Sequence, residues 1–410
     1  MNNMNDTESN LNQMKDIHQC ILQFIDNDDN QEESYHNVVM HLENINFISD
    51  TDNIRQILYL LAQLSDCHYR KSNFFGKIEK LLEFLKDSIQ KRFSRDEIFN
   101  IFRKNKRILL FLFEQGLLIL DQPLIKLFCT NEYRRYRYIS YFSPEIKPLI
   151  TFDEKKKYFS LDLSNLTKES QMPHDCLEVL KKELITDLPE NFYDKRKIGE
   201  NDTKLCRFIR NDSLDLFIEY MKQKNIPFNT YIMPSIYETH RKIDDISKKV
   251  NLISYALFFG SIQIFSYLQQ NYADQHLDLF NLSVYSNNIS IIKQVENIHQ
   301  LNINTEIMFK EAIECHHNDI ANYIQCNYMD QQQNLPHYDL EKNIYTNSIH
   351  YRNFSFFPGD FKNPFLFYYF CKYNYVNIVE NYLKTTSVDL NKLYILNFYF
   401  FNNVSFLIFS

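Results

Sequence analysis

Tryptophan is absent from this chain of 410 residues, and glycine occurs only 5 times. Five glycines are too few to make a glycine-rich phosphate-binding loop a plausible feature, and neither GxxxxGK[ST] nor GxGxxG occurs. The GxSxG and HExxH motifs are also missing, which removes the common local signatures of serine hydrolases and zinc peptidases. These absences predict a protein that is not an enzyme and that binds no cofactor.

Paired cysteines are missing as well, because the eight cysteines are scattered and include no CxxC motif. In a chain of this length, that usage predicts reduced thiols and a cytoplasmic protein. An alternative stays open: with 8 Cys and 12 His, a cysteine nucleophile and a histidine base could form a cysteine-dependent hydrolase in the N-terminal region.

Residues of the types that ligate metals form one close cluster in the sequence, which is Cys315, His316 and His317. Zinc sites usually draw four ligands from close pairs, and no second pair lies near these residues. We therefore favour a turn role for the two histidines, with hydrogen bonds to neighbouring loops, and expect no metal site.

Clustered positive charge is scarce too. The formal net charge of −7 argues against a general nucleic-acid binder, since nonspecific affinity for nucleic acid rests on basic patches. Arg134, Arg135 and Arg137 alternate with tyrosines, and such a cluster can stack bases and hold phosphates. An irregular surface segment is the favoured interpretation, so no nucleic-acid partner is expected.

The N-terminal half has the periodicity of helices. Residues 1–16 are polar and predict a disordered terminus rather than a secretory signal. Residues 17–199 predict a helical region with a charged linker near 151–199, and Ser94 and Glu97 form a capping-box pattern.

The most apolar part of this half is the stretch Ile108–Leu120. It has 13 residues and includes Glu114, whereas a bilayer span needs about 20 residues. We predict a buried helix with a turn near Gly116.

The stretch Ile253–Leu268, ISYALFFGSIQIFSYL, has a pattern that recurs through the C-terminal half. Ile253 and Ala256 can share one apolar face of a helix. Gly260 is expected to end that helix in the left-handed conformation, and Ile264 then begins a second apolar face. The stretch predicts a helix–turn–helix pair that packs against a neighbour.

Equivalent turn positions occur at Asp212, Asn287, His316 and Asn374. From Asp212 through Gly260 to Asn374 the spacings are 48, 27, 29 and 58 residues, the last being twice 29. Asparagine tolerates left-handed geometry best among non-glycine residues. A period near 30 predicts a solenoid of helix pairs over residues 200–395, with an insertion at 221–250 and one poorly formed repeat within 330–362.

This pattern resembles the ankyrin-repeat family, in which Leu-His-x-Ala-Ala-x-x-Gly-His-x-x-Ile-Val-x-Leu-Leu is typical. The Gly-His pair matches as Gly260-Ser261, Asn287-Asn288 and His316-His317, and the Ile-Val pair matches best as Ile378-Val379. The Thr-Pro-Leu-His opening is absent, so the repeats are degenerate. More closely, stretches such as KIEKLLEFL, YFSPEIK and LCRFIRNDSLDLFIEYM are similar to ankyrin-repeat proteins of protists such as Trichomonas that have an associated domain of unknown function.

The resemblance implies an interaction protein and brings no catalytic residues. A solenoid of repeats leaves an extended concave face free for binding. The predicted function is therefore a noncatalytic adaptor or scaffold for a protein partner that the sequence does not identify, in an oligomeric state that it does not set. The predicted contact residues are exposed neighbours of the first-helix core: Ser254, Phe258, Tyr285, Lys310, Glu314, Tyr368 and Lys372.

The last 18 residues, LYILNFYFFNNVSFLIFS, have no charged side chain. A membrane tail anchor is an alternative, because about 20 apolar residues can span a bilayer. Asn397, Asn402 and Asn403 interrupt the apolar run. We expect the aromatic tail at 396–410 to cap the solenoid, and we do not expect membrane association.

Overall fold

The computed structural model describes residues 2–44, 47–71, 73–128, 138–151, 188, 190–243, 250–271, 279–298, 304–330, 337–358 and 364–385. Over these residues the regular secondary structure is helical, and the only β geometry in them is an isolated bridge between Tyr231 and Asn251. The predicted all-α fold class is confirmed.

The chain forms two units, each assembled from segments that are distant in the sequence. The first unit contains Met1–Gln63, Arg70–Lys77 and Ile324–Ser410, and the second contains Leu64–Tyr69 and Ile78–Tyr323. This division cuts across the boundary predicted near residue 200, because helices of the N-terminal half lie in both units.

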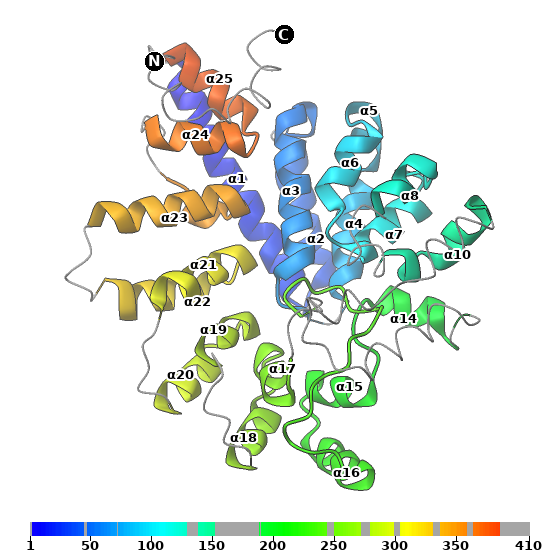
Figure 1. Cartoon of the computed structure of the whole chain (residues 1–410). Helices are drawn as coiled ribbons and strands as arrows, with labels where there is room; N and C mark the ends of the chain where they lie inside the picture. The colour runs from blue at the N-terminus through cyan, green and yellow to red at the C-terminus, as the bar shows by residue number, and fades with distance from the viewer. Residues whose placement is uncertain are drawn as a thin grey trace. The chain divides into compact units, whose positions relative to one another are not determined.

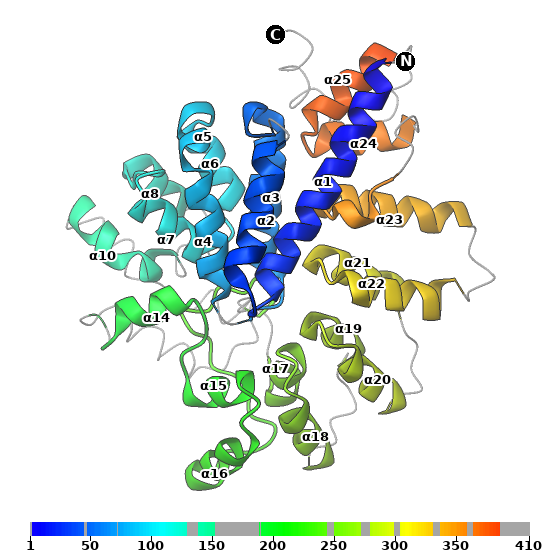
Figure 2. The same cartoon turned by 180° about the vertical axis from the view of Figure 1, so that it is seen from behind.

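The first unit begins with two packed helices and ends with three. Its helices are α1 (Asn2–Asp26), α2 (Gln31–Asn44), η1 (Phe47–Ser49), most of α3 (Thr51–Cys67), η4 (Gln325–Met329), α23 (His337–Tyr351), η5 (Phe354–Phe356), α24 (Pro364–Lys372) and α25 (Val376–Thr385). In it, α1 packs along α2, η5 and α25. Figure 2 shows α1 beside α25.

The N-terminal residues are helical rather than disordered, so that prediction for residues 1–16 is wrong. Helix α1 begins at Asn2. Leu11, Met14, His18 and Ile21 recur at spacings of three and four residues and are buried. The packing of this stripe stabilises α1, which a composition rich in polar residues does not reveal.

The second unit contains several pairs of helices that follow each other directly in the chain. Its helices are most of α4 (Phe74–Phe84), α5 (Lys86–Arg92), α6 (Arg95–Phe102), α7 (Lys106–Glu114), α8 (Gln122–Phe128), α10 (Ser143–Ile146), η2 (Lys147–Leu149), α14 (Phe192–Ile198), α15 (Lys204–Arg210), α16 (Leu214–Lys224), α17 (Leu252–Phe258), α18 (Ile262–Asn271), α19 (Leu279–Ser283), η3 (Val284–Ser286), α20 (Ile289–Ile298), α21 (Thr305–Cys315) and all but the last residue of α22 (Asn318–Ile324).

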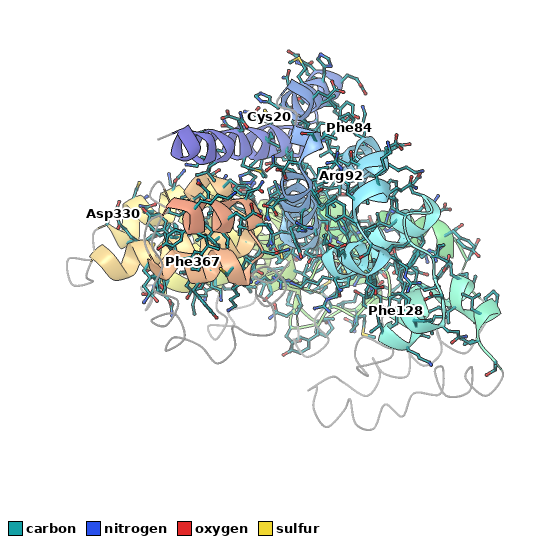
Figure 3. The ribbon with its side chains drawn as sticks, turned by 90° about the horizontal axis from the view of Figure 1, so that it is seen from above. Cys20, Phe84, Arg92, Phe128, Asp330 and Phe367 are labelled. Atoms are coloured by element: carbon teal, nitrogen blue, oxygen red, sulfur yellow. The ribbon has the colours of Figure 1, made fainter. Side chains whose placement is uncertain are left out.

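Local signals in its first helices behave as predicted. The Ser94 side chain accepts from the Glu97 amide, and the Glu97 side chain accepts from the Ser94 amide, so the capping box is confirmed. Helix α7 is buried, and the chain turns at Gly116 with a φ of 69°. Phe128, labelled in Figure 3, stacks on Phe142 with ring centroids 5.5 Å apart.

All five predicted turn positions have left-handed backbone geometry. The φ angles are 48° at Asp212, 71° at Gly260, 49° at Asn287, 57° at His316 and 63° at Asn374. The helix pairs α15/α16, α17/α18 and α21/α22 meet at three of these turns (Figure 1). The predicted helix–turn–helix geometry is confirmed at these positions.

The same backbone hydrogen bond closes four of these five turns, those at Asp212, Gly260, His316 and Asn374. The amide after the left-handed residue donates to a carbonyl four residues before that residue, as in a Schellman motif. The donor amides are those of Ser213, Ser261, His317 and Tyr375, with N···O distances of 2.9, 2.9, 3.0 and 3.0 Å. Turns of this kind also occur at Gly116, Asn225 and Arg352. The turn at Arg352 has a φ of 58° and a 3.0 Å bond from the Asn353 amide. It lies within residues 330–362, where one poorly formed repeat was expected.

Side chains at these turns also join consecutive helix pairs. The hydroxyl of Ser261 donates to the Ile209 carbonyl, and Nδ1 of His317 bonds the Val284 carbonyl at 2.8 Å. In the first unit, the Tyr375 hydroxyl donates to the Ile349 carbonyl at 2.8 Å. Each acceptor lies three residues before the preceding left-handed residue, so the three bonds are equivalent.

Replacing Gly260 with alanine is expected to destabilise the chain by about 1–2 kcal/mol, because a side chain is strained at positive φ. Space is not the cause, since an added Cβ would meet its nearest atom, the Ser286 carbonyl oxygen, at 3.5 Å. Urea unfolding would measure the change. The matched control is Asn287→Gly, which relieves the same strain. A loss of stability in the control equal to that of Gly260→Ala would contradict this account.

Candidate functional site

The structure buries four of the seven predicted contact residues. Ser254, Phe258, Tyr285 and Glu314 are buried, so the expectation that they are exposed is wrong. Lys310 and Lys372 are exposed, and Tyr368 is half-buried. The first helices of the pairs in the second unit therefore do not present a free face at these four positions.

The physical reason is that the predicted insertion folds over these helices. The ring of His240 contacts the ring of Phe258 at a centroid distance of 4.6 Å, and Phe258 stacks on Tyr285 at 5.0 Å. Lys242 Nζ lies 5.5 Å from the centre of the Tyr285 ring. We call residues 235–243 the covering segment.

Three further bonds fix the covering segment within the second unit. Lys106 Nζ donates to the Ile236 carbonyl at 2.6 Å, and the Thr239 hydroxyl donates to the Gly199 carbonyl at 2.7 Å. The Arg241 amide donates to the Asp66 carbonyl at 3.2 Å. The segment is thus tied to parts of the chain that are far away in sequence.

A group of ionisable side chains gathers under the covering segment, and we call it the Cys67 cluster. Cys67 ends helix α3, and Glu311, Glu314 and Cys315 lie on one face of α21 because their spacings are three and four residues. The covering segment adds the two cations. The members of the cluster are Cys67, Arg241, Lys242, Glu311, Glu314 and Cys315.

Charges in this cluster are paired at short range. Arg241 forms an ion pair with Glu314, and its Nη2 atom lies 3.4 Å from Cys67 Sγ. Lys242 Nζ lies 3.0 Å from Glu314 Oε2 and also pairs with Glu311. The Glu314 side chain is only 3% exposed. Burial of this carboxylate is tolerable because two cations compensate its charge.

The cluster shifts the pKa values of its two thiols in opposite directions. A hydrogen bond from Cys315 lowers the pKa of Cys67, and the charges of Arg241 and Lys242 lower it further. Burial and the neighbouring Cys67 thiolate raise the pKa of Cys315. Of the two thiols, Cys67 therefore has the lower pKa and loses its proton more readily.

Histidines around the cluster are held by backbone groups. His68 Nδ1 lies 2.7 Å from the Cys315 carbonyl, and His240 Nε2 lies 3.2 Å from the Cys67 carbonyl. His317 Nε2 accepts from the Tyr69 amide at 3.2 Å, while its Nδ1 donates to Val284. The predicted turn role of His317 is confirmed. Among the described residues, no group of three or more His, Cys, Asp or Glu is arranged to hold a metal ion.

The arrangement favours thiol chemistry but gives a bulky substrate no access. Cys67 and Cys315 are 1% and 0% exposed. A hydrolase substrate could reach neither sulfur unless the covering segment moved. A bond between the two sulfurs would likewise require a two-electron oxidant to reach them.

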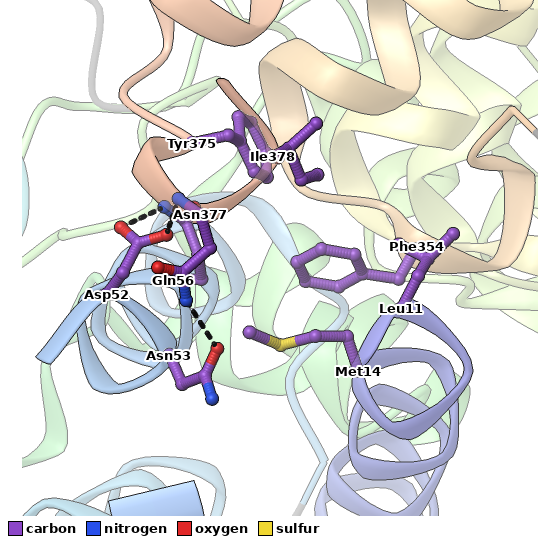
Figure 4. Close-up of a pocket in the computed structure, with 9 residues that line it drawn as sticks. All are labelled: Leu11, Met14, Asp52, Asn53, Gln56, Phe354, Tyr375, Asn377 and Ile378. Atoms are coloured by element: carbon purple, nitrogen blue, oxygen red, sulfur yellow. Dashed lines mark hydrogen bonds between the residues drawn. The ribbon is translucent and has the colours of Figure 1, made fainter. Parts of the chain in front are cut away.

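The first unit contains a small cavity between α1, α3, η5 and α25 (Figure 4). Its volume is about 60 Å³, which is room for a few water molecules. Asp52 in its wall accepts from the Asn377 amide at 3.1 Å and from Gln56 Nε2 at 3.3 Å. Asp52 thereby caps the N-terminus of α25. The cavity is lined by Leu11, Met14, Asp52, Asn53, Gln56, Phe354, Tyr375, Asn377 and Ile378.

Burial raises the pKa of Asp52 above its ordinary value of 3.8. The folded chain therefore binds this proton more tightly than the unfolded chain, and the stabilisation is present below pH 3.8 and is lost as pH rises through the folded pKa. We expect the stability difference between wild type and Asp52→Asn to decrease over that range. Urea unfolding at several pH values would measure it, and a difference that increases with pH would contradict the assignment.

No family model, curated protein or solved structure matches the chain. The resemblance to ankyrin-repeat proteins thus depends on the motifs in the sequence. Among the described residues, no helix is long and apolar enough to cross a membrane. The Arg–Tyr cluster at 133–137, most of the charged linker near 151–199 and the tail at 396–410 lie outside the described residues.

Sequence reasoning did not identify the Cys67 cluster. Its two cysteines are 248 residues apart, and neither has a local motif. Arg241 and Lys242 lie in the stretch 221–250, which the sequence predicts to be an insertion. Only the spacing of Glu311, Glu314 and Cys315 on one helix face was available as a signal.

Proposed function

We infer that this chain is a noncatalytic protein-binding scaffold built on a degenerate ankyrin-type array. The observation that carries the proposal is the repeated bond between consecutive turns, seen at Ser261, His317 and Tyr375. Repeats joined only to their neighbours can vary their outer residues without loss of the fold, which suits the binding of a partner. Reduced thiols support a cytoplasmic location.

Binding is assigned to the predicted residues that the chain leaves uncovered. In the second unit this is Lys310 on α21, and in the first unit these are Tyr368 and Lys372 on α24. Lys372 Nζ lies 5.7 Å from the centre of the Tyr368 ring, so the two side chains form one local surface. The proposed contact set leaves out the four buried residues Ser254, Phe258, Tyr285 and Glu314.

Affinity capture from cell extract tests this proposal. The full chain is compared with Tyr368→Ala/Lys372→Glu, with Lys310→Glu, and with the control Lys384→Glu on α25, whose side chain is 64% exposed. We expect a protein that is retained by wild type and control and lost by at least one variant at the proposed contacts. Equal retention by all four folded proteins would contradict the assignment of the surface.

The lowered pKa of Cys67 favours a second candidate, the cysteine-dependent hydrolase. The burial of the thiol weighs against it. An electrophilic peptide probe would label Cys67 in the native chain if this candidate were right, and Cys67→Ser would abolish the label. We expect labelling only after denaturation.

A further inference from the structure

Two thiols from distant parts of the sequence meet in the second unit. Cys67 lies at the C-terminal end of α3, and Cys315 lies at the C-terminal end of α21. The two helix ends lie against each other, since His68 Nδ1 lies 2.7 Å from the Cys315 carbonyl and Cys67 Sγ lies 3.9 Å from the Oε1 atom of Glu314, the residue before Cys315. Proximity of two cysteines is the first requirement for a disulfide.

Arg241 makes this pair different from an inert buried pair. Its guanidinium lies 3.4 Å from Cys67 Sγ and pairs with Glu314. The Arg241 side chain is 35% exposed, so it forms the boundary between the buried thiols and solvent. Because Cys67 is 1% exposed, an oxidant can reach it only when a neighbouring side chain such as Arg241 moves.

Other buried cysteines lack these features and serve as internal references. Burial raises the pKa of Cys206 to about 11 and that of Cys371 to about 12. Such thiols behave as small apolar side chains and are inert to oxidants. The cation beside Cys67 is not needed for a purely structural cysteine.

We propose that Cys67 and Cys315 form a peroxide-responsive dithiol that closes reversibly to an intrachain disulfide. The proposal does not depend on the scaffold function. It assigns Cys67 as the sulfur that reacts with hydrogen peroxide, Cys315 as the resolving thiol, and Arg241 as the residue that positions the anionic sulfur.

The reaction has two steps. In the first, the Cys67 thiolate attacks one oxygen of hydrogen peroxide and the O–O bond breaks, which leaves a sulfenic acid at Cys67. The departing hydroxide takes up the proton that Cys67 has lost and becomes water. The Cys315 sulfur then attacks Cys67, the S–O bond breaks, and the leaving hydroxyl takes the Cys315 proton as a second water.

The disulfide would tie the end of α3 to the end of α21 within the second unit. It would close a loop of 248 residues, and a loop of that length restricts the unfolded chain strongly. It would also remove the negative charge that faces Arg241. Oxidation is therefore expected to raise the melting temperature, and a thiol reductant such as dithiothreitol is expected to reverse the rise.

The test uses the full chain, treated with increasing hydrogen peroxide and then alkylated and digested without reduction. We expect one linked peptide pair containing Cys67 and Cys315, with Cys206 and Cys371 still free. Arg241→Gln is expected to slow its formation. In Cys315→Ser, no disulfide forms, and dimedone should trap the sulfenic acid at Cys67.

Two results would overturn the proposal. The first is peroxide that modifies the exposed Cys326 while Cys67 and Cys315 both stay free in the folded chain. The second is a linked pair that forms only in denaturant. The dimedone adduct in Cys315→Ser gives the test a readout if Cys67→Ser does not fold.

Discussion

Glu314→Ala is expected to lower the free energy of unfolding by about 3–5 kcal/mol, the usual cost of removing one partner from a buried ion pair. The variant leaves Arg241 and Lys242 without the carboxylate that both contact. It also removes the contact between this carboxylate and Cys67. Urea unfolding followed by circular dichroism would measure the loss.

The control for this variant is Glu380→Ala on α25. Glu380 pairs with Lys384 at 3.5 Å, but both side chains are more than half exposed. Exposed ion pairs contribute about 0–1 kcal/mol, so the control should lose little stability. A loss below about 1 kcal/mol in Glu314→Ala would mean that the buried charge cluster does not stabilise the fold.

Phe258→Ala is expected to cost about 3–5 kcal/mol, because it removes a large buried ring and leaves a cavity. Phe258 is 4% exposed and lies between the rings of His240 and Tyr285. The same urea titration would measure the effect. The matched control is Leu216→Ala on α16, a residue that is 51% exposed.

This variant also separates two roles for Phe258. A core residue lowers stability when truncated, whereas a surface contact residue lowers affinity for a partner and leaves stability unchanged. Leu216→Ala should change stability by less than about 1 kcal/mol. A stable Phe258→Ala chain that no longer captured a partner would restore the original assignment of this residue as a contact.

The turns could be predicted from the sequence because their cause is local. Gly260, Asn287 and Asn374 tolerate positive φ, and the apolar residues around them have helical spacing. The turn at Arg352 could not be located this way. Arginine is not a typical left-handed residue, and Arg352 lies 36 residues after His316 rather than 29.

The covering segment could not be predicted, because its position depends on contacts between distant residues. Lys106 and Ile236 are 130 residues apart, and Arg241 and Cys67 are 174 residues apart. Local composition marks an insertion, but it does not say where the insertion docks. Four of the seven predicted contact residues are therefore buried rather than exposed.

The sequence of helix α1 contains an apolar stripe at helical spacing, although its overall composition is polar. Leu11, Met14 and Ile21 fall on one face, yet the polar residues around them suggested disorder. Packing of an amphipathic face, rather than helix propensity, supplies most of the stability of such a helix.

The most direct test of the covered first-helix face is hydroxyl-radical footprinting of the full, folded chain. Oxidation is measured at Phe258 and Tyr285, with Tyr193 and Tyr231 as exposed references at 53% and 45% exposure. We expect strong protection of Phe258 and Tyr285 and ready modification of the two references. Modification of Phe258 and Tyr285 at the rate of the references would contradict the account, because the covering segment would then not lie over the first helices.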